Sequence, residues 1–284
     1  MSIVVTGATG HLGRLVVEQL LEKVPADQVT AVVRTPEKAA DLAGRGVRLA
    51  VADYNAPETF DGLFSAGDKV LLVSGSEVDK DRVQQHKVVI DAAGAAGVAL
   101  LAYTSAPGTL RAALADDHRG TEQALLASGL PYTLLRNGWY HENYTEQLAP
   151  VLEHGAVVQA AGDGRVSSAA RADYAAAAVA VLTGEGHENA TYELGGDEAW
   201  SFADFAAELS RQTGRDIAYR PVSVEEYQGI LAGAGLPGPL AAVLAGVDAS
   251  IAKGELVVTS GDLTRLTGRP ATPLAEAIAV ALKG

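Results

Sequence analysis

Short apolar runs and amphipathic stretches alternate along the first half of the chain. Apolar runs of this length are typical of buried strands, whereas apolar residues recurring every three or four positions indicate helices. The pattern predicts strands at residues 3–6, 29–33, 47–51, 70–73, 100–104 and 132–135. Between them it predicts helices at residues 11–22, 36–43, 57–64, 82–96 and 116–128.

Helices that connect apolar strands indicate right-handed crossovers and a parallel sheet covered on both faces. The expected fold class is therefore α/β, a Rossmann-like doubly wound parallel sheet. After residue 150 the pattern becomes mostly helical, with short strands expected at 191–194, 217–220 and 256–258. We expect residues 1–150, with parts of 151–195, to form the sheet domain. Residues 196–284 are expected to form a smaller C-terminal lobe over the sheet edge, with a substrate cleft between the two.

Three glycines interrupt the first strand–helix connection at a spacing of three: Gly7, Gly10 and Gly13. Glycines in such a turn permit a tight bend, close approach of a pyrophosphate to the backbone, and close packing of the helix on the strand. The helix start also offers free N–H groups to a diphosphate. The alternative is a glycine-rich turn without a ligand. The expected dinucleotide contacts are Gly7, Ala8, Thr9, Gly10, His11 and Leu12.

The second strand is followed by Arg34, where a fold specific for NAD usually has a carboxylate for the ribose 2′-hydroxyl. An arginine accommodates a 2′-phosphate instead, so NADP(H) is favoured over NAD(H). Lys38 adds positive charge one turn into the next helix. The alternative for Arg34 is a solvated surface side chain.

Further candidates lie at other strand ends, where ligands bind in this architecture. Asp53 either accepts a hydrogen bond from the adenine amino group or caps the following helix. Small residues after the fourth strand let the cofactor pass, and Tyr103 lies at the end of the fifth. These cofactor candidates are Asp53, Ser74, Gly75, Ser76 and Tyr103.

Residues 136–144 gather aromatic, amide and imidazole side chains directly after the sixth strand. Such a loop suits a wall of the cofactor and substrate site, although its aromatic residues are equally suited to packing. The acceptor candidates are Asn137, Tyr140 and Asn143, with His118 and Tyr103 as weaker ones. Arg171, at the start of a later helix, contacts either the cofactor or a carboxylate.

Composition narrows the classes of function. The formal net charge of −13 argues against general nucleic-acid binding. The absence of cysteine excludes disulfides and thiolate metal sites, and no metal site is expected. No apolar run is long enough for a membrane span, and the chain starts without the pattern of a signal peptide. We therefore expect a cytoplasmic protein, a monomer or a homodimer, without nucleic-acid or membrane partners.

The proton relay of ordinary short-chain dehydrogenases is missing. Ser105 stands where that family has its serine, but no Tyr-x-x-x-Lys occurs in the chain, and His118 and Glu122 occupy that spacing instead. Tyr132 and Arg136 have a similar spacing on a predicted strand. Hydride delivery to an ordinary ketone needs such an acid. Reduction of a quinone gives an anion with a tyrosine-like pKa of ~10, and a cationic dye needs no proton.

Five stretches carry a resemblance over essentially the whole chain: 6–13 with Arg34, 132–144, 160–164, 171–177 and 266–270. They resemble the NmrA-like atypical short-chain dehydrogenases. Together the stretches are similar to the type 2 NADPH:quinone oxidoreductases of bacteria and to the similar triphenylmethane reductases. The resemblance implies that NADPH is held by Gly7–Leu12, Arg34, Ser74–Ser76 and the loop of Gly138, Trp139, Tyr140, His141, Glu142 and Asn143. That family also lacks the Tyr/Lys pair.

These observations predict an NADPH-dependent oxidoreductase that transfers hydride to a small aromatic or quinone-like acceptor. Two alternatives stay open. One is a regulatory protein that senses NADP(H) without turnover, and the other is a reductase of a different conjugated substrate, such as a triphenylmethane dye.

Overall fold

The structure is a computed structural model that describes residues 2–77 and 81–283. Its contacts divide the chain into two units, each assembled from segments that are not consecutive in the sequence. Unit 1 consists of Met1–Ala106, Asp117–Asn137 and Arg171–Tyr192. Unit 2 consists of Pro107–Asp116, Gly138–Ala170 and Glu193–Gly284.

Unit 1 is organised by a seven-stranded sheet in the order β3-β2-β1-β4-β5-β6-β9. The neighbours from β3 across to β6 all pair in parallel. The strands are β1 (Ile3–Val5), β2 (Val29–Val33), β3 (Arg48–Val51), β4 (Lys69–Leu72), β5 (Leu100–Ser105), β6 (Tyr132–Asn137) and β9 (Ala190–Leu194). Because the chain crosses over β1 between β3 and β4, the strand order reverses there, and this is where such sheets bind ligands at their carboxyl ends.

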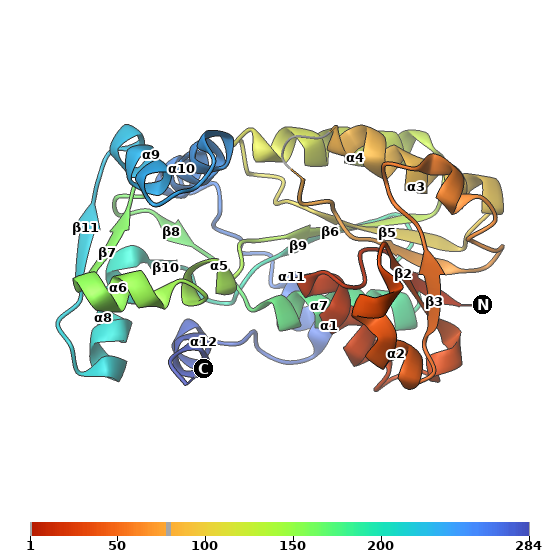
Figure 1. Ribbon diagram of the computed structural model, residues 1–284, viewed down its shortest axis with the longest axis horizontal. Coiled ribbons are helices and arrows are strands. Elements are labelled where there is room, and N and C mark those ends of the chain that lie inside the picture. Colours follow the sequence, from red (N-terminus) through yellow and green to blue (C-terminus); the bar gives the residue numbers. More distant parts are fainter. Residues whose placement is uncertain (1, 78–80, 284) are drawn as a thin grey trace. The chain divides into compact units, whose positions relative to one another are not determined.

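Helices cover both faces of this sheet (Figure 1). α3 (Arg82–Ala96) and α4 (Leu114–Ala127) lie on one face, and α1 (His11–Leu20) and α7 (Arg171–Thr183) lie on the other. Shorter elements are η1 (Ala26–Gln28), η2 (Pro36–Ala39), α2 (Ala40–Gly44) and η3 (Pro57–Phe60). Alternate strand residues face α3 and α4, where buried apolar side chains form one cluster that includes Val4, Val70, Leu72, Leu101, Tyr103, Val89 and Ile90. The Rossmann-like fold expected from the sequence is confirmed.

The structure corrects two predicted elements. Residues 57–64 were expected to form a helix, but η3 is a single turn that ends before Gly62, whose φ of 68° breaks a right-handed helix. Residues 256–258 are not a strand, because Val257 N–H bonds within its own turn, to the carbonyl of Gly254.

Unit 2 contains two small sheets surrounded by helices (Figure 1). β7 (Ala156–Gln159) pairs in parallel with β11 (Ala218–Pro221), and β8 (Arg165–Val166) pairs antiparallel with β10 (Trp200–Ser201). The pattern missed β7, β8 and β10, the last two because two residues show no periodicity. The helices are α5 (Glu142–Thr145), α6 (Leu148–His154), α8 (Phe202–Thr213), α9 (Val224–Gly233), α10 (Gly238–Ala252), α11 (Asp262–Thr267) and α12 (Leu274–Ala281).

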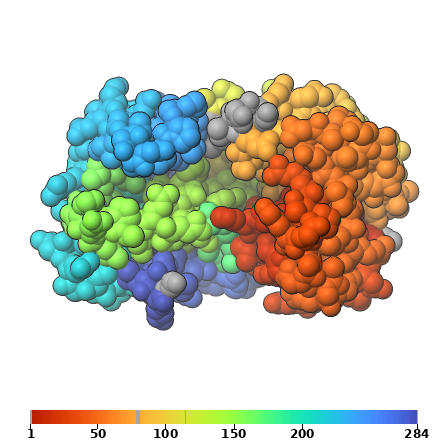
Figure 2. Space-filling model, viewed as in Figure 1, coloured from red at the N-terminus to blue at the C-terminus, as the bar shows by residue number. Residues whose placement is uncertain are grey.

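Aromatic packing holds unit 2 together. Tyr144 meets the rings of Trp200 and Phe202 edge-on, with centroids 5.5 and 5.1 Å apart, and Trp200 stacks on Phe205 at 5.7 Å. Such pairs add about 0.5–1.5 kcal/mol beyond the area that they bury. In the space-filling view, the green segment containing α5 and α6 lies beside the blue helices α9 and α10 (Figure 2).

A buried carboxyl joins the elements of unit 2. Asp248 of α10 is 3% exposed, and its Oδ2 accepts the N–H of Ala160 at 2.6 Å. Burial raises the pKa of Asp248 to about 7, only partly offset by that hydrogen bond. The carboxylate charge in turn helps to raise the pKa values of the Tyr144, Tyr219 and Tyr227 phenols.

Each described helix is too short or too polar to cross a lipid bilayer.

We expect the Asp248→Asn variant to gain stability relative to the wild type as the pH rises. The folded chain holds this proton more tightly than the unfolded chain, so the wild type loses stability between about pH 4 and pH 7. The loss is on the order of 2–4 kcal/mol, and an asparagine does not suffer it. Urea unfolding at pH 5 and pH 8 measures the difference, with Glu225→Gln as an exposed control. An equal pH dependence in Asp248→Asn and wild type would contradict this account.

Candidate functional site

The glycine turn of unit 1 brings the start of α1 to the carboxyl end of β1. Gly7 has a φ of 60°, and the N–H of Gly10 closes the turn on the carbonyl of Gly7 at 2.9 Å. Gly10 is the N-cap of α1 and has no side chain to satisfy the first N–H groups of the helix. The turn therefore presents free donors and the positive end of the helix dipole at this edge of the sheet.

Gly13 lets α1 approach the turn closely. A Cβ at this position would lie 2.4 Å from the carbonyl oxygen of Gly7 and 3.1 Å from the Cα of Ala8. A Cβ at Gly10 would be 3.2 Å from the same oxygen. Close packing of α1 on the turn thus requires a glycine at position 13, as the sequence indicated, whereas contact between the turn and a pyrophosphate stays a prediction.

Arg34 follows β2 at the same edge of unit 1. Its guanidinium is 64% exposed and donates to Oε1 of Glu77 at 2.9 Å. That hydrogen bond, together with one from Gln85, lowers the pKa of Glu77 below its usual value. Arg34 is therefore neither buried nor simply solvated, but is held at the edge of the sheet by a carboxylate.

Asp53 forms a local turn. Its carboxylate accepts the backbone N–H of Asn55 at 2.9 Å and the side-chain amide of Asn55 at 3.1 Å. η3 begins after Ala56 without a side-chain cap, so the capping alternative for Asp53 is wrong. Contact between Asp53 and adenine stays a prediction.

The turn at Ser74, Gly75 and Ser76 is fixed by one helix, α3, and one strand, β5, of unit 1. The N–H of Gly75 donates to Nε2 of His86 at 2.9 Å, and Arg82 reaches the carbonyl of Gly75 at 3.4 Å. The N–H of Ser74 donates to the hydroxyl of Thr104 at 2.9 Å. Both polar groups of the Gly75 peptide are thus engaged by α3.

His86 must be neutral to accept this hydrogen bond. Its Nδ1 then carries the proton and donates to Oγ1 of Thr121 at 2.8 Å, which in turn donates to the carbonyl of Asp117 at 2.9 Å. Burial, with the nearby charge of Arg82, lowers the pKa of His86 to about 4. The imidazole is accordingly neutral at neutral pH, with Nε2 as a fixed hydrogen-bond acceptor and Nδ1–H as a hydrogen-bond donor.

Polar side chains along β5 and β6 are largely paired with one another. Ser105 donates to Oε1 of Glu122 at 2.6 Å, and Arg136 donates to both oxygens of Glu122 at 2.9 and 2.7 Å. Tyr103 is fully buried, and its hydroxyl lies 2.9 Å from Nδ1 of His118. Burial raises the pKa of Tyr103 and lowers that of His118 to about 3. Neither Ser105 nor Tyr103 stands ready as a general acid.

Some buried acceptors in unit 1 have no hydrogen-bond partner among the residues that the structure describes, and two of them lie near the carboxyl ends of the strands. They are Oδ1 of Asn137, at the carboxyl end of β6, and Oε1 of Gln85, which lies 3.3 Å from where a Cβ of Gly75 would be. An orphaned buried acceptor is costly and indicates a missing donor. Together with the uncapped α1 and the exposed guanidinium of Arg34, these atoms fit a phosphate-bearing ligand that also carries amide or hydroxyl donors.

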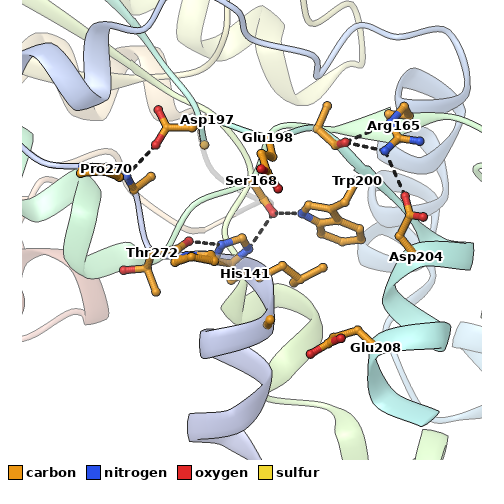
Figure 3. Close-up of a pocket in the computed structure, with 16 residues that line it drawn as sticks. His141, Arg165, Ser168, Asp197, Glu198, Trp200, Asp204, Glu208, Pro270 and Thr272 are labelled. Atoms are coloured by element: carbon orange, nitrogen blue, oxygen red, sulfur yellow. Dashed lines mark hydrogen bonds and ion pairs between the residues drawn. The ribbon is translucent and has the colours of Figure 1, made fainter. Parts of the chain in front are cut away.

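The loop from Gly138 to Asn143 belongs to unit 2. Trp139 and His141 exchange backbone hydrogen bonds with Ala169, at 3.2 and 3.0 Å. The His141 side chain is 1% exposed and lines a cavity of about 510 Å³ (Figure 3). Tyr140 bridges to Ala169, whereas Glu142 and Asn143 open the short helix α5.

A directed chain of hydrogen bonds fixes His141 (Figure 3). Trp200 Nε1 donates to Ser168 Oγ at 2.8 Å, Ser168 donates to His141 Nδ1 at 2.8 Å, and Nε2 donates to the carbonyl of Thr272 at 3.0 Å. The carbonyl can only accept, which sets the tautomer of the ring. The imidazole of His141 anchors the loop, and contact between this loop and a cofactor stays a prediction.

Of the remaining sequence candidates, Arg171 is the first residue of α7 in unit 1. Sequence reasoning missed Glu77, Arg82, Gln85 and His86. Arg82, Gln85 and His86 recur on the buried face of α3 at the spacing of Val89 and Ala93. Polar residues that continue the apolar face of this helix were the sequence signal that could have identified them as buried and functional.

Comparisons with known proteins extend over the whole chain. A family described as NAD(P)H-binding matches residues 7–185. Quinone oxidoreductase 2 of Escherichia coli (strain K12) is 47% identical over 278 residues, which cover 97% of each chain. The crystal structure of an NADPH-dependent quinone oxidoreductase from Escherichia coli complexed with NADPH has a TM-score of 0.95 and 46% identity, covering 99% of both chains. That of Citrobacter sp. triphenylmethane reductase complexed with NADP(H) has a TM-score of 0.94 and 43% identity, covering 99% of this chain and 100% of the other.

We expect Gly13→Ala to destabilise the protein by about 1–3 kcal/mol, because the new methyl group meets backbone atoms that cannot rotate away. Thermal unfolding measures the effect. Gly94→Ala is the matched control, since Gly94 lies in α3 with nothing within 4 Å of where its Cβ would be, and that variant should gain up to about 1 kcal/mol. Equal melting temperatures for Gly13→Ala and wild type would show that the turn accommodates a Cβ at position 13 without strain.

Proposed function

Because the chain belongs to the NAD(P)H-binding family, we propose that it is an NADPH-dependent oxidoreductase that reduces quinone-type acceptors. The observation that carries this proposal is the near-full-length likeness to the quinone oxidoreductase of Escherichia coli, in sequence and in fold. The NmrA-like resemblance inferred from the sequence is confirmed by the same likeness, and the NADPH and NADP(H) complexes of these relatives support the preference for NADP(H).

Bound NADPH supplies the hydride, and the residues of this chain bind and orient it. We assign the diphosphate to the Gly7–Leu12 turn and the 2′-phosphate to Arg34, whose planar guanidinium suits bidentate contacts with phosphate oxygens. The Ser74–Ser76 turn, rigidly held by His86 and Arg82, provides a further backbone surface at the same edge. Asn137, with its unpartnered Oδ1, is our candidate to accept from the carboxamide of the nicotinamide.

The chemistry of the strand ends favours acceptors that need no strong general acid. Ser105 and Arg136 are committed to Glu122, and the Tyr103 hydroxyl lies buried beside His118. A reduced quinone carries a phenolate-type charge with a pKa of ~10, which one or two hydrogen-bond donors and water suffice to accommodate. We propose Asn137, Tyr140 and Asn143 as the donors that contact the acceptor.

Reduction of a cationic dye is the second candidate. The likeness to the Citrobacter triphenylmethane reductase favours it, and an acceptor of this kind becomes neutral on receiving hydride, so that no proton donor is required. A regulator that binds NADP(H) without turnover remains the alternative that a kinetic assay excludes or supports. We further propose that the protein is a monomer or homodimer in the cytoplasm.

The decisive experiment follows the cofactor absorbance of purified protein mixed with NADPH and a simple benzoquinone, with NADH in a parallel cell. We expect consumption of NADPH above the uncatalysed rate and little consumption of NADH. A panel that includes a triphenylmethane dye ranks the two substrate classes by kcat/KM. Tight binding of NADPH with no turnover of any acceptor would contradict the proposed enzyme and favour a regulator that senses NADP(H).

We expect Arg34→Glu to weaken NADPH binding by about 30- to 150-fold, the loss of roughly 2–3 kcal/mol from charged hydrogen bonds to a phosphate. NADH binding should change far less, because it lacks that phosphate. Isothermal titration with each cofactor measures both, and Arg45→Glu, an exposed arginine of unit 1, controls for the change in net charge. Unchanged NADPH affinity in Arg34→Glu would show that Arg34 does not bind the 2′-phosphate.

A further inference from the structure

We propose that Glu77 competes with the 2′-phosphate of the cofactor for Arg34 and thereby limits the preference of this protein for NADPH over NADH. The inference rests on the proposed function, because it concerns the residue that we assign to the phosphate. It makes Glu77 a specificity-determining residue that opposes the charge of the cofactor rather than contributing to its binding.

The position of Glu77 is set by contacts on both sides of its carboxylate. Oε1 accepts from the guanidinium of Arg34 at 2.9 Å, and Oε2 accepts from Nε2 of Gln85 at 3.2 Å. A hydrogen bond with Asn55 also helps to lower the pKa of Glu77, so the carboxylate is ionised at neutral pH. Gln85 is 6% exposed and also donates to Oδ1 of Asn55 at 3.0 Å, which holds its amide in place.

This arrangement places a negative charge where a doubly charged phosphate is proposed to bind. The ion pair joins residues 43 positions apart, from the end of β2 and the segment after β4, on either side of β1. A phosphate of roughly −2 charge can engage Arg34 fully only if the carboxylate of Glu77 gives up its hydrogen bond with the guanidinium. A ribose with a free 2′-hydroxyl does not meet this cost, because a hydroxyl can donate to a carboxylate.

The size of the effect follows from exposure. Arg34 is 64% and Glu77 34% exposed, and ion pairs of this kind contribute up to about 1 kcal/mol. Neutralising Glu77 should therefore tighten the binding of ligands with a 2′-phosphate by about two- to fivefold. Ligands without that phosphate should change by less than twofold.

The test uses equilibrium binding and needs no turnover. Isothermal titration of Glu77→Gln and wild type with 2′,5′-ADP, 5′-ADP, NADPH and NADH separates the phosphate from the rest of the cofactor. Asp91→Asn is the matched control, because it also removes one carboxylate of an exposed ion pair from unit 1, near the other end of α3. We expect Glu77→Gln and Glu77→Ala to bind 2′,5′-ADP and NADPH more tightly than wild type does. Asp91→Asn should bind them with unchanged affinity.

A double-mutant cycle shows whether Glu77 acts through Arg34. In an Arg34→Gln background, Glu77→Gln should no longer tighten 2′,5′-ADP binding. Weaker or unchanged binding in Glu77→Gln overturns the inference, as does a gain that persists without Arg34. A gain of equal size for 5′-ADP does the same, since it shows a general effect on the turn. If wild type binds no NADPH, the proposed function fails together with the inference. If wild type binds NADPH tightly but Glu77→Gln does not change that affinity, only the inference fails.

Discussion

The contact between Gly13 and the carbonyl of Gly7 is the constraint on which the rest of unit 1 depends. A Cβ at Gly13 would stand 2.4 Å from that carbonyl oxygen, so there is room for hydrogen only, and this permits α1 to start directly at the carboxyl end of β1. Every other candidate for the cofactor in unit 1 is placed relative to that edge, because parallel pairing aligns the ends of β2, β4, β5 and β6 with the end of β1. A larger residue at this one position would displace the helix terminus from the edge where the strands end.

The sequence predicts the features that depend on local pattern. The parallel strands, the glycine spacing and Arg34 are all visible in short stretches, because a buried strand needs an apolar run and a tight turn needs glycine. The pairing of Arg34 with Glu77 is not visible, since it joins residues that only the strand order brings together. The same holds for the His86–Gly75 bond and the Ser105–Glu122–Arg136 group, in which polar residues on helices satisfy polar atoms at strand ends. Very short elements such as β8 and β10 are also beyond a pattern, because two residues have no period.

Electrostatics in this protein is local rather than global. The chain carries a formal charge of −13, which disfavours an anionic cofactor as a whole. Against this background, the α1 terminus and the Arg34 guanidinium supply positive potential at one edge, while the buried imidazoles of His86 and His118 stay neutral because burial and Arg82 lower their pKa values. The neutral imidazole of His86 thus helps to shape the Ser74–Ser76 turn, and the positive charge of Arg34 lies where a phosphate is proposed to bind.

Unit 1 is not synthesised without interruption, because its segment Arg171–Tyr192 follows a segment of unit 2 in the sequence. α7 covers one face of the central sheet, yet it is translated only after the 138–170 segment of unit 2. At 5–20 residues per second, a ribosome needs roughly 2–7 s to synthesise that intervening stretch. During this interval the sheet has β1 to β6 available but lacks the helix that packs on β4, β5 and β6, so apolar strand faces stay open to a chaperone or to a neighbouring nascent chain. The order of the two units along the sequence therefore leaves part of one sheet face uncovered until α7 has been synthesised.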